Sequence, residues 1–181
     1  GGFNFMEFLK NDLVIVNPLK IKRWIIDELE ASMVLYFIGA SRSSAAIIDQ
    51  QKKNTSSGNE KAIEAMHKIK QSAIDMKQAL LKGDMKEFSR ILGEGWENKK
   101  KMADNITNSM IQEVFDLAIS AGAVAGKVSG AGGGGFVMLM VEPTRKKELI
   151  NALKKLNGFV MPFHFTEGGA HGWKIYSTNK V

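Results

Sequence analysis

A glycine-rich segment in the last third of the chain has the composition of an anion-binding loop. Residues 127–136 read Lys-Val-Ser-Gly-Ala-Gly-Gly-Gly-Gly-Phe, so five of these ten residues are glycine. Glycine loses more conformational freedom on folding than any other residue, so such a run needs a reason. One reason is a backbone with positive φ that points successive N–H groups at one anion. Another is the close approach of a ligand or a second loop. A tight turn between two strands, without a ligand, is the alternative.

Charged and polar side chains near such a loop could complete the site. Lys127 and Ser129 would add a cation and a hydroxyl at its mouth. Arg42, followed by Ser43, is a candidate for binding a phosphate that the substrate already carries, because a planar guanidinium donates to two phosphate oxygens. A surface arginine at the start of a helix is the alternative for Arg42. His171 lies in a glycine-containing turn and could line a sugar pocket.

Other basic residues and the histidines give weaker signals. Lys100 could contact the same phosphate, but the run 99–101 is more typical of a solvated helix face. The three histidines, His67, His164 and His171, lack the spacing of a metal motif such as His-Glu-x-x-His. No metal site is therefore predicted within this chain.

Motif spacing and composition exclude several classes of protein. The glycine segment is not a P-loop, because Lys127 precedes the glycines and a strand follows them. It is not a dinucleotide fingerprint, which opens a helix inside a βαβ unit. The net charge of +6 comes from basic residues that form no single dense block, which favours small anionic ligands over nucleic acid. The absence of cysteine excludes disulfides and thiol catalysis. No apolar run approaches the ~20 residues that span a bilayer, so no membrane partner is expected.

The elements that must position these residues follow from periodicity and turn signals. Strands are predicted over 13–16, 21–26, 32–38, 136–141, 159–165 and 173–176. Helices are predicted over 60–82, 84–102, 109–121 and 145–156, with a shorter one after Ser44. Most of the helices thus lie between two strand-rich ends, which indicates an α+β domain with an antiparallel sheet. The methionine-rich stripe of the helix over 60–82 is expected to pack in the core, with a homodimer contact as the alternative.

The glycine segment resembles a known motif. Residues 126–136 are similar to the third conserved motif of the GHMP kinases, a superfamily of galactose, homoserine, mevalonate and phosphomevalonate kinases. Residues 1–4 resemble a segment that follows the central part of its sugar-kinase branch. Residues 41–44 resemble that branch's form of a Thr-Gly-x-x-Arg segment, and residues 96–107 resemble its helical part. The resemblance over the whole chain favours the heptose 7-phosphate kinases of bacterial polysaccharide synthesis.

This resemblance implies an activity and a set of contacts. The family transfers the γ-phosphoryl group of ATP to a hydroxyl with Mg²⁺, here the anomeric hydroxyl of a heptose 7-phosphate in the cytoplasm. Ser129, Gly130, Ala131, Gly132 and Gly133 would then contact the ATP phosphates and the transferred group, where backbone donors suit the chemistry. A fucose, galactose or mevalonate-type kinase is the alternative within the superfamily. A non-catalytic ferredoxin-like anion-binding module is the alternative outside it.

The resemblance also implies a fold and a missing part. The fold would be a ferredoxin-like two-layer domain, with an antiparallel sheet packed with helices. The family's Pro-x-x-x-Gly-Leu-Gly-Ser-Ser loop, which wraps the ATP phosphates, is not found in this sequence. We therefore expect residues 1–181 to be a C-terminal domain, with residues 1–10 as the tail end of an N-terminal domain. The catalytic aspartate would lie upstream of Gly1, the metal ligands would lie in the missing domain, and this part alone would be inactive.

Overall fold

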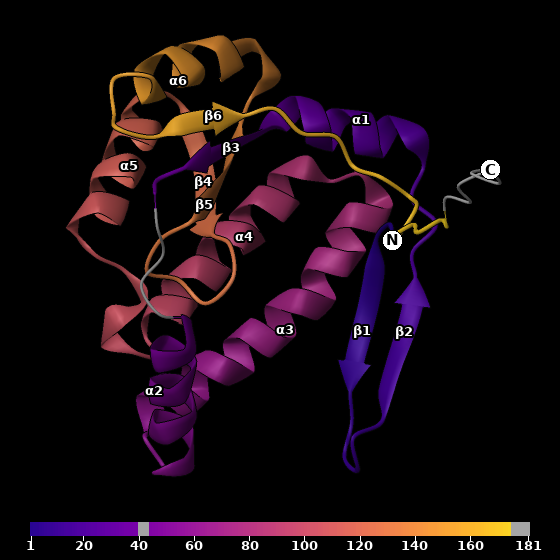
Figure 1. The fold of residues 1–181 in the computed structure, drawn as a ribbon, viewed down its shortest axis with the longest axis vertical. Helices are drawn as coiled ribbons and strands as arrows, with labels where there is room; N and C mark the ends of the chain where they lie inside the picture. Colours follow the sequence, from indigo (N-terminus) through magenta and orange to yellow (C-terminus); the bar gives the residue numbers. More distant parts are fainter. Residues whose placement is uncertain (40–43, 175–181) are drawn as a thin grey trace, which may run out of the picture.

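A four-stranded antiparallel sheet lies at the centre of the computed structural model, which describes residues 1–39 and 44–174. Its strand order is β4-β5-β3-β6, formed by β3 (Met33–Phe37), β4 (Ala123–Val128), β5 (Phe136–Val141) and β6 (Phe159–Met161). The first of these strands in the chain is therefore internal and pairs with the third and the fourth, as in a ferredoxin-like sheet. The predicted α+β class and antiparallel sheet are confirmed (Figure 1).

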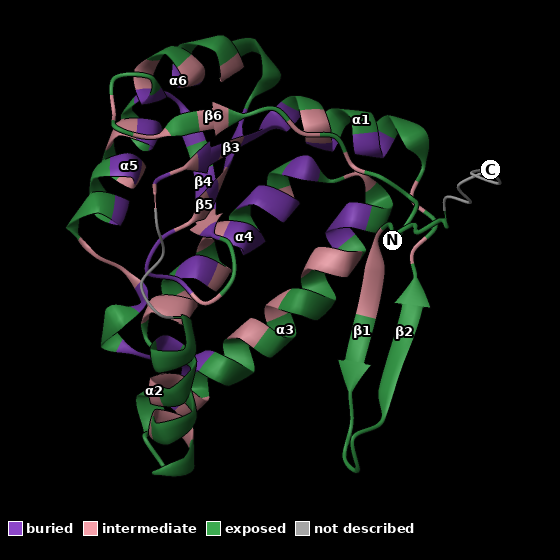
Figure 2. Ribbon diagram, in the orientation of Figure 1, coloured by how far each residue is buried: buried purple, intermediate pink, exposed green. Residues whose placement is uncertain are grey.

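Helices connect the strands and cover both faces of the sheet (Figure 1). The helical elements are α1 (Arg23–Ser32), α2 (Ser44–Ser56), α3 (Glu60–Lys82), α4 (Met85–Lys100), the 3₁₀ turn η1 (Asp104–Ile106), α5 (Ser109–Ser120), the 3₁₀ turn η2 (Pro143–Arg145) and α6 (Lys146–Leu153). Val34 and Tyr36 of β3 pack on the side of α5 and α6. Met33 packs on the opposite side, with α1 and α4. This alternation buries the central strands (Figure 2).

The long helix α3 has the predicted bounds, and its caps explain why. Asn59 accepts a hydrogen bond from the backbone N–H of Ala62 at 3.0 Å. Gly83 ends the helix with φ of +74°, a conformation that glycine adopts without strain. Asp84 then caps α4 by accepting from the N–H of Glu87 at 2.9 Å.

The apolar stripe of α3 is only partly in the core, which corrects the prediction. The two ends of the helix bury alanines and Leu80, whereas Met66 is 40% exposed and Ala73 is also exposed. The physical reason is geometric. The helix packs against α4 as an antiparallel hairpin and diverges from the sheet toward α2, so its middle lies away from the sheet (Figure 1).

Several predicted strands are wrong, and packing or backbone chemistry explains each difference. Residues 21–26 contain the start of helix α1, because Ile25, Ile26 and Leu29 bury one helical face, although the two isoleucines are β-branched. Strand β6 ends at Met161 because Pro162 has no N–H to donate. Residues 173–174 belong to no strand, and residues 175–176 lie outside the described residues.

A separate two-stranded ribbon precedes the sheet. It consists of β1 (Asn4–Phe8) and β2 (Val14–Pro18), joined through Asn11 and Asp12, which both have positive φ. The ribbon lies beside α3, where Lys77 sits over the ring of Phe5 at 4.0 Å (Figure 1). Its β2 strand is exposed throughout (Figure 2).

Candidate functional site

The glycine segment forms the connection between β4 and β5. Its five glycines, Gly130 and residues 132–135, all have φ between +74° and +155°. Residues with a side chain rarely adopt this region, so the predicted positive-φ loop is confirmed. Strand β4 leads into it, although the composition of 123–128 gave little sign of a strand. A Cβ at Gly126 would lie 2.8 Å from the carbonyl oxygen of Met138, so glycine allows the close approach of β4 to β5.

Two hydrogen bonds hold the centre of the loop against the turn before α5. The N–H of Gly133 donates to the carbonyl of Ile106 at 2.9 Å. The carbonyl of Gly133 accepts from Nδ2 of Asn108 at 3.2 Å. A Cβ at Gly132 would lie 2.7 Å from the Ile106 carbonyl oxygen. The loop therefore follows a path that its neighbours determine.

Two further hydrogen bonds anchor the ends of the loop. The N–H of Ser129 donates to the carbonyl of Phe136 at 2.8 Å. The N–H of Gly135 donates to the carbonyl of Gly39 at 3.3 Å, just beyond the end of β3. The end of the loop is thus anchored to the central strand of the sheet.

Several N–H groups of the loop have no acceptor among the described residues. The N–H groups of Gly132 and Gly134 belong to buried residues, yet they donate to no acceptor within residues 1–39 and 44–174. The same holds for the N–H groups of Gly130 and Ala131, which are more exposed. Most buried N–H groups in proteins are paired, so these donors are suited to binding an anion. This arrangement supports an anion-binding loop over a plain strand-to-strand turn.

Two lysines lie at the mouth of the loop. Lys127, at the end of β4, is half-buried, and burial lowers the pKa of its ammonium group. Lys99, in the last turn of α4, donates to the carbonyl of Gly130. Burial first, and then the positive charge of Lys127, lower the pKa of Lys99. Neither lysine forms an ion pair with a carboxylate of the described residues, so the positive charge at this site is uncompensated.

Sequence reasoning missed Lys99, because the run 99–101 was interpreted as a solvated face. The helical spacing contained a usable signal. Leu92, Trp96 and Lys99 are separated by four and three residues, and the first two are buried core residues. Lys100 is directed elsewhere and pairs with Glu97 at 2.7 Å.

The other predicted substrate residues are not brought to this loop by the described structure. Arg42 and Ser43 lie outside the described residues. The chain enters that gap at Gly39, which accepts a hydrogen bond from the loop. His171 lies near Gly168, beside the N-terminus of the chain and away from the loop (Figure 1). A sugar-binding role for His171 stays a prediction.

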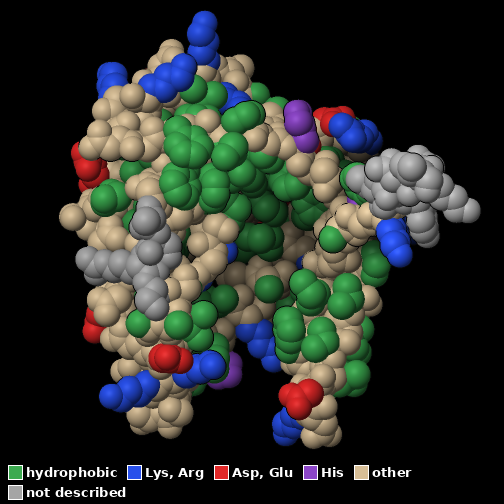
Figure 3. Space-filling model, in the orientation of Figure 1, with side chains coloured by type: hydrophobic (Ala, Val, Ile, Leu, Met, Phe, Trp, Pro, Cys, Tyr) green, Lys and Arg blue, Asp and Glu red, His purple; other side chains and the backbone are tan. Residues whose placement is uncertain are grey.

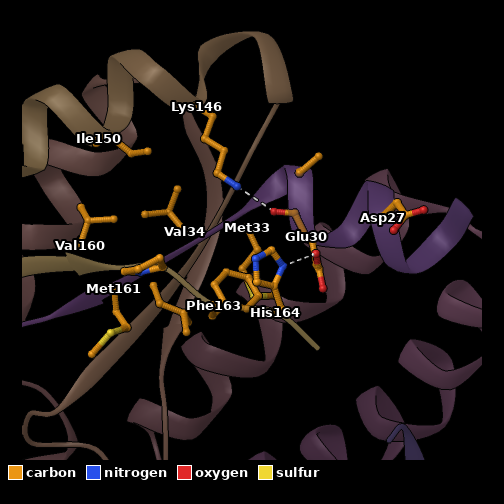
Figure 4. A pocket seen from close by; sticks show the side chains of 13 residues that line it. Asp27, Glu30, Met33, Val34, Lys146, Ile150, Val160, Met161, Phe163 and His164 are labelled. Atoms are coloured by element: carbon orange, nitrogen blue, oxygen red, sulfur yellow. Dashed lines mark hydrogen bonds and ion pairs between the residues drawn. The ribbon is translucent and has the colours of Figure 1, made fainter. Parts of the chain in front are cut away.

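A cavity of about 550 Å³ lies at the end of β3 that is opposite the glycine loop, between α1, β6 and α6 (Figure 4). Its polar groups satisfy one another. The N–H of Phe165 donates to the Glu30 carboxylate at 2.7 Å, and Nδ1 of His164 lies 3.1 Å from the other carboxylate oxygen. Nζ of Lys146 donates to the backbone carbonyl of Glu30 at 2.7 Å. The hydrogen bond from Phe165, followed by that with His164, lowers the pKa of Glu30. Apolar side chains line the rest of this cavity.

The described residues contain no group of three His, Asp or Glu side chains that could hold a metal ion. In the same residues, no helix has the length and apolar character that crossing a bilayer requires.

Comparisons with known proteins show what the chain is similar to. Residues 76–157 match the family described as GHMP kinases C terminal. The chain is 49% identical over 175 residues to D-glycero-alpha-D-manno-heptose 7-phosphate kinase of Campylobacter jejuni. The matched region covers 97% of the chain and 51% of that protein. The crystal structure of a D-glycero-D-manno-heptose 1-phosphate kinase from Bacteroides thetaiotaomicron shares 61% identity over 98% of the chain and 46% of that protein, with a TM-score of 0.72.

A more distant structure shares the fold alone. The L. major mevalonate kinase in complex with R-mevalonate is 15% identical over 86% of the chain and 45% of that protein, with a TM-score of 0.72. The chain spans about half the length of these relatives. The matched family, the ferredoxin-like sheet and the glycine loop together show that this chain contains the C-terminal domain of a GHMP kinase.

Proposed function

We propose that the chain is the C-terminal part of an ATP-dependent sugar kinase. The complete enzyme would transfer the γ-phosphoryl group of ATP to the anomeric hydroxyl of a heptose 7-phosphate, for bacterial polysaccharide synthesis. One observation carries this proposal. The loop over 129–135 presents unpaired N–H groups beside two lysines, in a chain that resembles heptose phosphate kinases over nearly its whole length.

The chemistry of phosphoryl transfer suits this loop. Such a transfer depends mostly on positioning and on stabilising charge on the phosphoryl oxygens, so fixed backbone donors are effective. In this proposal, Ser129, Gly130, Ala131, Gly132 and Gly133 contact the ATP phosphates and the transferred group. Hydrogen bonds from both sides keep the loop in place, so little reorganisation is needed when the phosphates bind.

The exposed β1–β2 ribbon supports a preceding domain. Its large apolar side chains include Phe8, which is 76% exposed, and Leu13, which is 54% exposed. A two-stranded ribbon is marginally stable by itself, and exposed apolar surface marks interaction sites. We propose that it packs against an N-terminal domain containing the ATP-binding loop, the catalytic aspartate and the Mg²⁺ ligands, with residues 1–10 as the end of that domain's segment. This part alone would then be inactive.

The remaining parts of the proposal follow from the same chemistry. ATP and a phosphorylated sugar are the partners, and the enzyme would act in the cytoplasm, where both are available. Nucleic acid and membranes are not expected as partners. A homodimer through the uncovered middle of α3, around Met66 and Ile74, stays a prediction.

The test is ADP release in the presence of Mg-ATP by this chain and by a version extended upstream. The panel would hold heptose 7-phosphate, heptose 1-phosphate, fucose, galactose and mevalonate, because the two relatives differ in the named position of the phosphate. Activity of the extended protein alone, with heptose 7-phosphate preferred, is the expected result. Gly133→Val in the extended protein should abolish turnover.

Other outcomes would replace the proposal. Preference for another acceptor would indicate a different GHMP kinase. Turnover by the 181-residue chain itself would show that the catalytic groups lie within it. Anion binding without turnover by either protein would favour a non-catalytic module.

A further inference from the structure

We propose that Lys99 and Lys127 together form a phosphate-binding site at the mouth of the glycine loop. The ligand is a phosphate monoester or polyphosphate on a small organic molecule. The inference deepens the proposed function by naming residues that bind the phosphate of the sugar or of ATP. It names Lys99, which sequence reasoning did not assign to the site.

The positions of the two lysines bring two positive charges to one place. They come from different elements, the last turn of α4 and the end of β4, and α4 packs directly on β4. Lys99 donates to the carbonyl of Gly130, which lies three residues after Lys127 in the chain, and the charge of Lys127 contributes to the lowered pKa of Lys99. Two ammonium groups repel each other, and partial burial makes that repulsion stronger than in water. A dianion between them would remove the repulsion, whereas no carboxylate of the described residues does so.

The backbone of the loop provides donors to the same ligand. Lys99 contacts the carbonyl of Gly130, and the next residues along the loop have N–H groups without partners. Thr107 adds a further signal. It lies between Ile106 and Asn108, the two residues that bind Gly133, and its buried hydroxyl has no hydrogen-bond partner among residues 1–39 and 44–174. Buried polar groups without a partner are rare in proteins, so the unpaired N–H groups of the loop, together with Thr107 in the turn that holds it, favour a ligand at this loop.

The neighbouring sheet face explains why the ligand would have an organic part. Lys127 stands opposite Met138 in the register of β4 and β5, so it shares a face with Met138 and with Phe136, two residues away. The ring of Phe136 lies 5.0 Å from that of Phe37, and Phe37 lies 5.1 Å from Phe159. Figure 3 shows hydrophobic side chains gathered over β3 and β6, beside a hollow between the sheet and the β1–β2 ribbon. A sugar or nucleoside could pack on these rings while its phosphate contacts the lysines.

A purely structural role is the rival explanation for Lys99. In that case its ammonium group only holds the loop in place through the hydrogen bond to the carbonyl of Gly130, and no ligand binds. The variant Lys99→Gln separates the two roles, because glutamine can still donate to Gly130 but carries no charge. Lys100→Met is the matched control. It removes the same charge one residue further along α4, where the lysine already pairs with Glu97.

The first experiment uses the 181-residue chain and measures its affinity for heptose 7-phosphate, inorganic pyrophosphate and ATP by calorimetry at fixed ionic strength. We expect Lys99→Met, Lys99→Gln and Lys127→Met each to weaken phosphate binding by about tenfold or more. Lys100→Met should change it less than about twofold. Affinity should fall as the pH rises through the lowered pKa of Lys99, because the deprotonated amine no longer attracts the dianion.

The second experiment uses the upstream-extended protein and separates the two sources of phosphate. If the variants at Lys99 and Lys127 raise KM for heptose 7-phosphate alone, the two lysines bind the phosphate of the acceptor. A rise in KM for ATP alone assigns it to the donor. Each result supports the phosphate site, and unphosphorylated heptose is the control for the acceptor.

Three results would overturn the inference. The first is that Lys99→Gln binds phosphate as tightly as the unaltered chain does. The second is that Lys100→Met weakens binding as much as Lys99→Met. The third is that neither the 181-residue chain nor the extended protein binds phosphate in the millimolar range. Failure of the proposed function is distinguishable from these. It would be seen as phosphate binding that depends on both lysines, in an extended protein that does not phosphorylate heptose 7-phosphate.

Discussion

The two ends of β3 meet different kinds of polar site. At the C-terminal end, Gly39 accepts a hydrogen bond from the glycine loop. Among the described residues, the N–H groups of Gly132 and Gly134 there donate to no acceptor, and Lys99 and Lys127 pair with no carboxylate. At the N-terminal end, beside Met33, the Glu30 carboxylate accepts a backbone hydrogen bond and contacts His164 (Figure 4). Lys146 there donates to a carbonyl.

This difference separates a ligand site from a structural one. Polar groups that satisfy one another hold elements together, as Glu30 joins α1 to the segment after β6. Polar groups that are fixed by their neighbours but left unpaired are ready for a ligand. The cavity beside Met33 is lined mostly by apolar side chains, and its Glu30 carboxylate already accepts the N–H of Phe165 and contacts His164.

The largest loss of stability should come from adding a side chain where the glycine loop packs closely against Ile106. Gly132 has φ of +110°, and a Cβ there would lie 2.7 Å from the Ile106 carbonyl oxygen. Gly132→Val should therefore lower the free energy of unfolding by about 3 kcal/mol or more, through backbone strain and overpacking. Urea denaturation would measure it.

Gly130→Ala is the control for this first prediction. Gly130 also has positive φ, but no atom lies within 4 Å of a Cβ built there. The strain of the left-handed conformation alone should cost about 1 kcal/mol. Equal losses for the two variants would show that the contact with Ile106 does not constrain the loop.

A smaller effect is expected from the residue that caps α5 and binds the loop. Asn108 accepts from the N–H of Ile111 at 2.9 Å and donates to the carbonyl of Gly133. Asn108→Ala should lower the free energy of unfolding by about 2 kcal/mol, from loss of the cap and of the loop contact. Asn59→Ala removes a cap from α3 without any loop contact and should cost about 1 kcal/mol. A larger loss for Asn59→Ala would contradict this assignment.

At the other end of β3, replacing Glu30 should change how the stability of the fold depends on pH. The hydrogen bond from Phe165 and the contact with His164 hold the pKa of Glu30 below its ordinary value of 4.5. The unfolded chain then binds more protons than the folded one between the two pKa values, so stability falls as the pH falls through that range. The contribution of Glu30 is complete above its ordinary pKa. Glu30→Gln should flatten this acid-dependent loss, measured by thermal unfolding between pH 6 and about 3.

Glu28→Gln is the matched control on the same helix. It removes an equal charge from an exposed position, and should alter the slope of stability against pH less than Glu30→Gln does. Identical slopes for the two variants would mean that the contacts of Glu30 do not stabilise the fold.

The smallest effect is expected at His164. Its side chain is 87% exposed although it lies 3.1 Å from Glu30. Exposed ion pairs contribute little, so His164→Ala should change the free energy of unfolding by no more than about 0.5 kcal/mol. A loss above about 1 kcal/mol would show that His164 is part of the structural site rather than at its edge.

Local signals in the sequence predicted the elements that depend on local chemistry. The bounds of α3 follow from its periodicity, from the cap at Asn59 and from Gly83. The strand over 136–141 and the loop before it follow from a run of apolar residues after a run of glycines. These features were predictable because helix caps, glycine conformations and short apolar runs act over a few residues.

Tertiary packing decided the rest. Residues 21–26 have strand-like composition but enter α1, because its buried face packs on the sheet. Strand β4 contains small residues with little strand preference, and pairing with β5 under α4 determines its conformation. The sequence by itself thus determined the glycine loop and the family resemblance. Only the folded structure placed Lys99 at this loop, because its contact with the carbonyl of Gly130 joins a helix end to a loop 31 residues further along the chain.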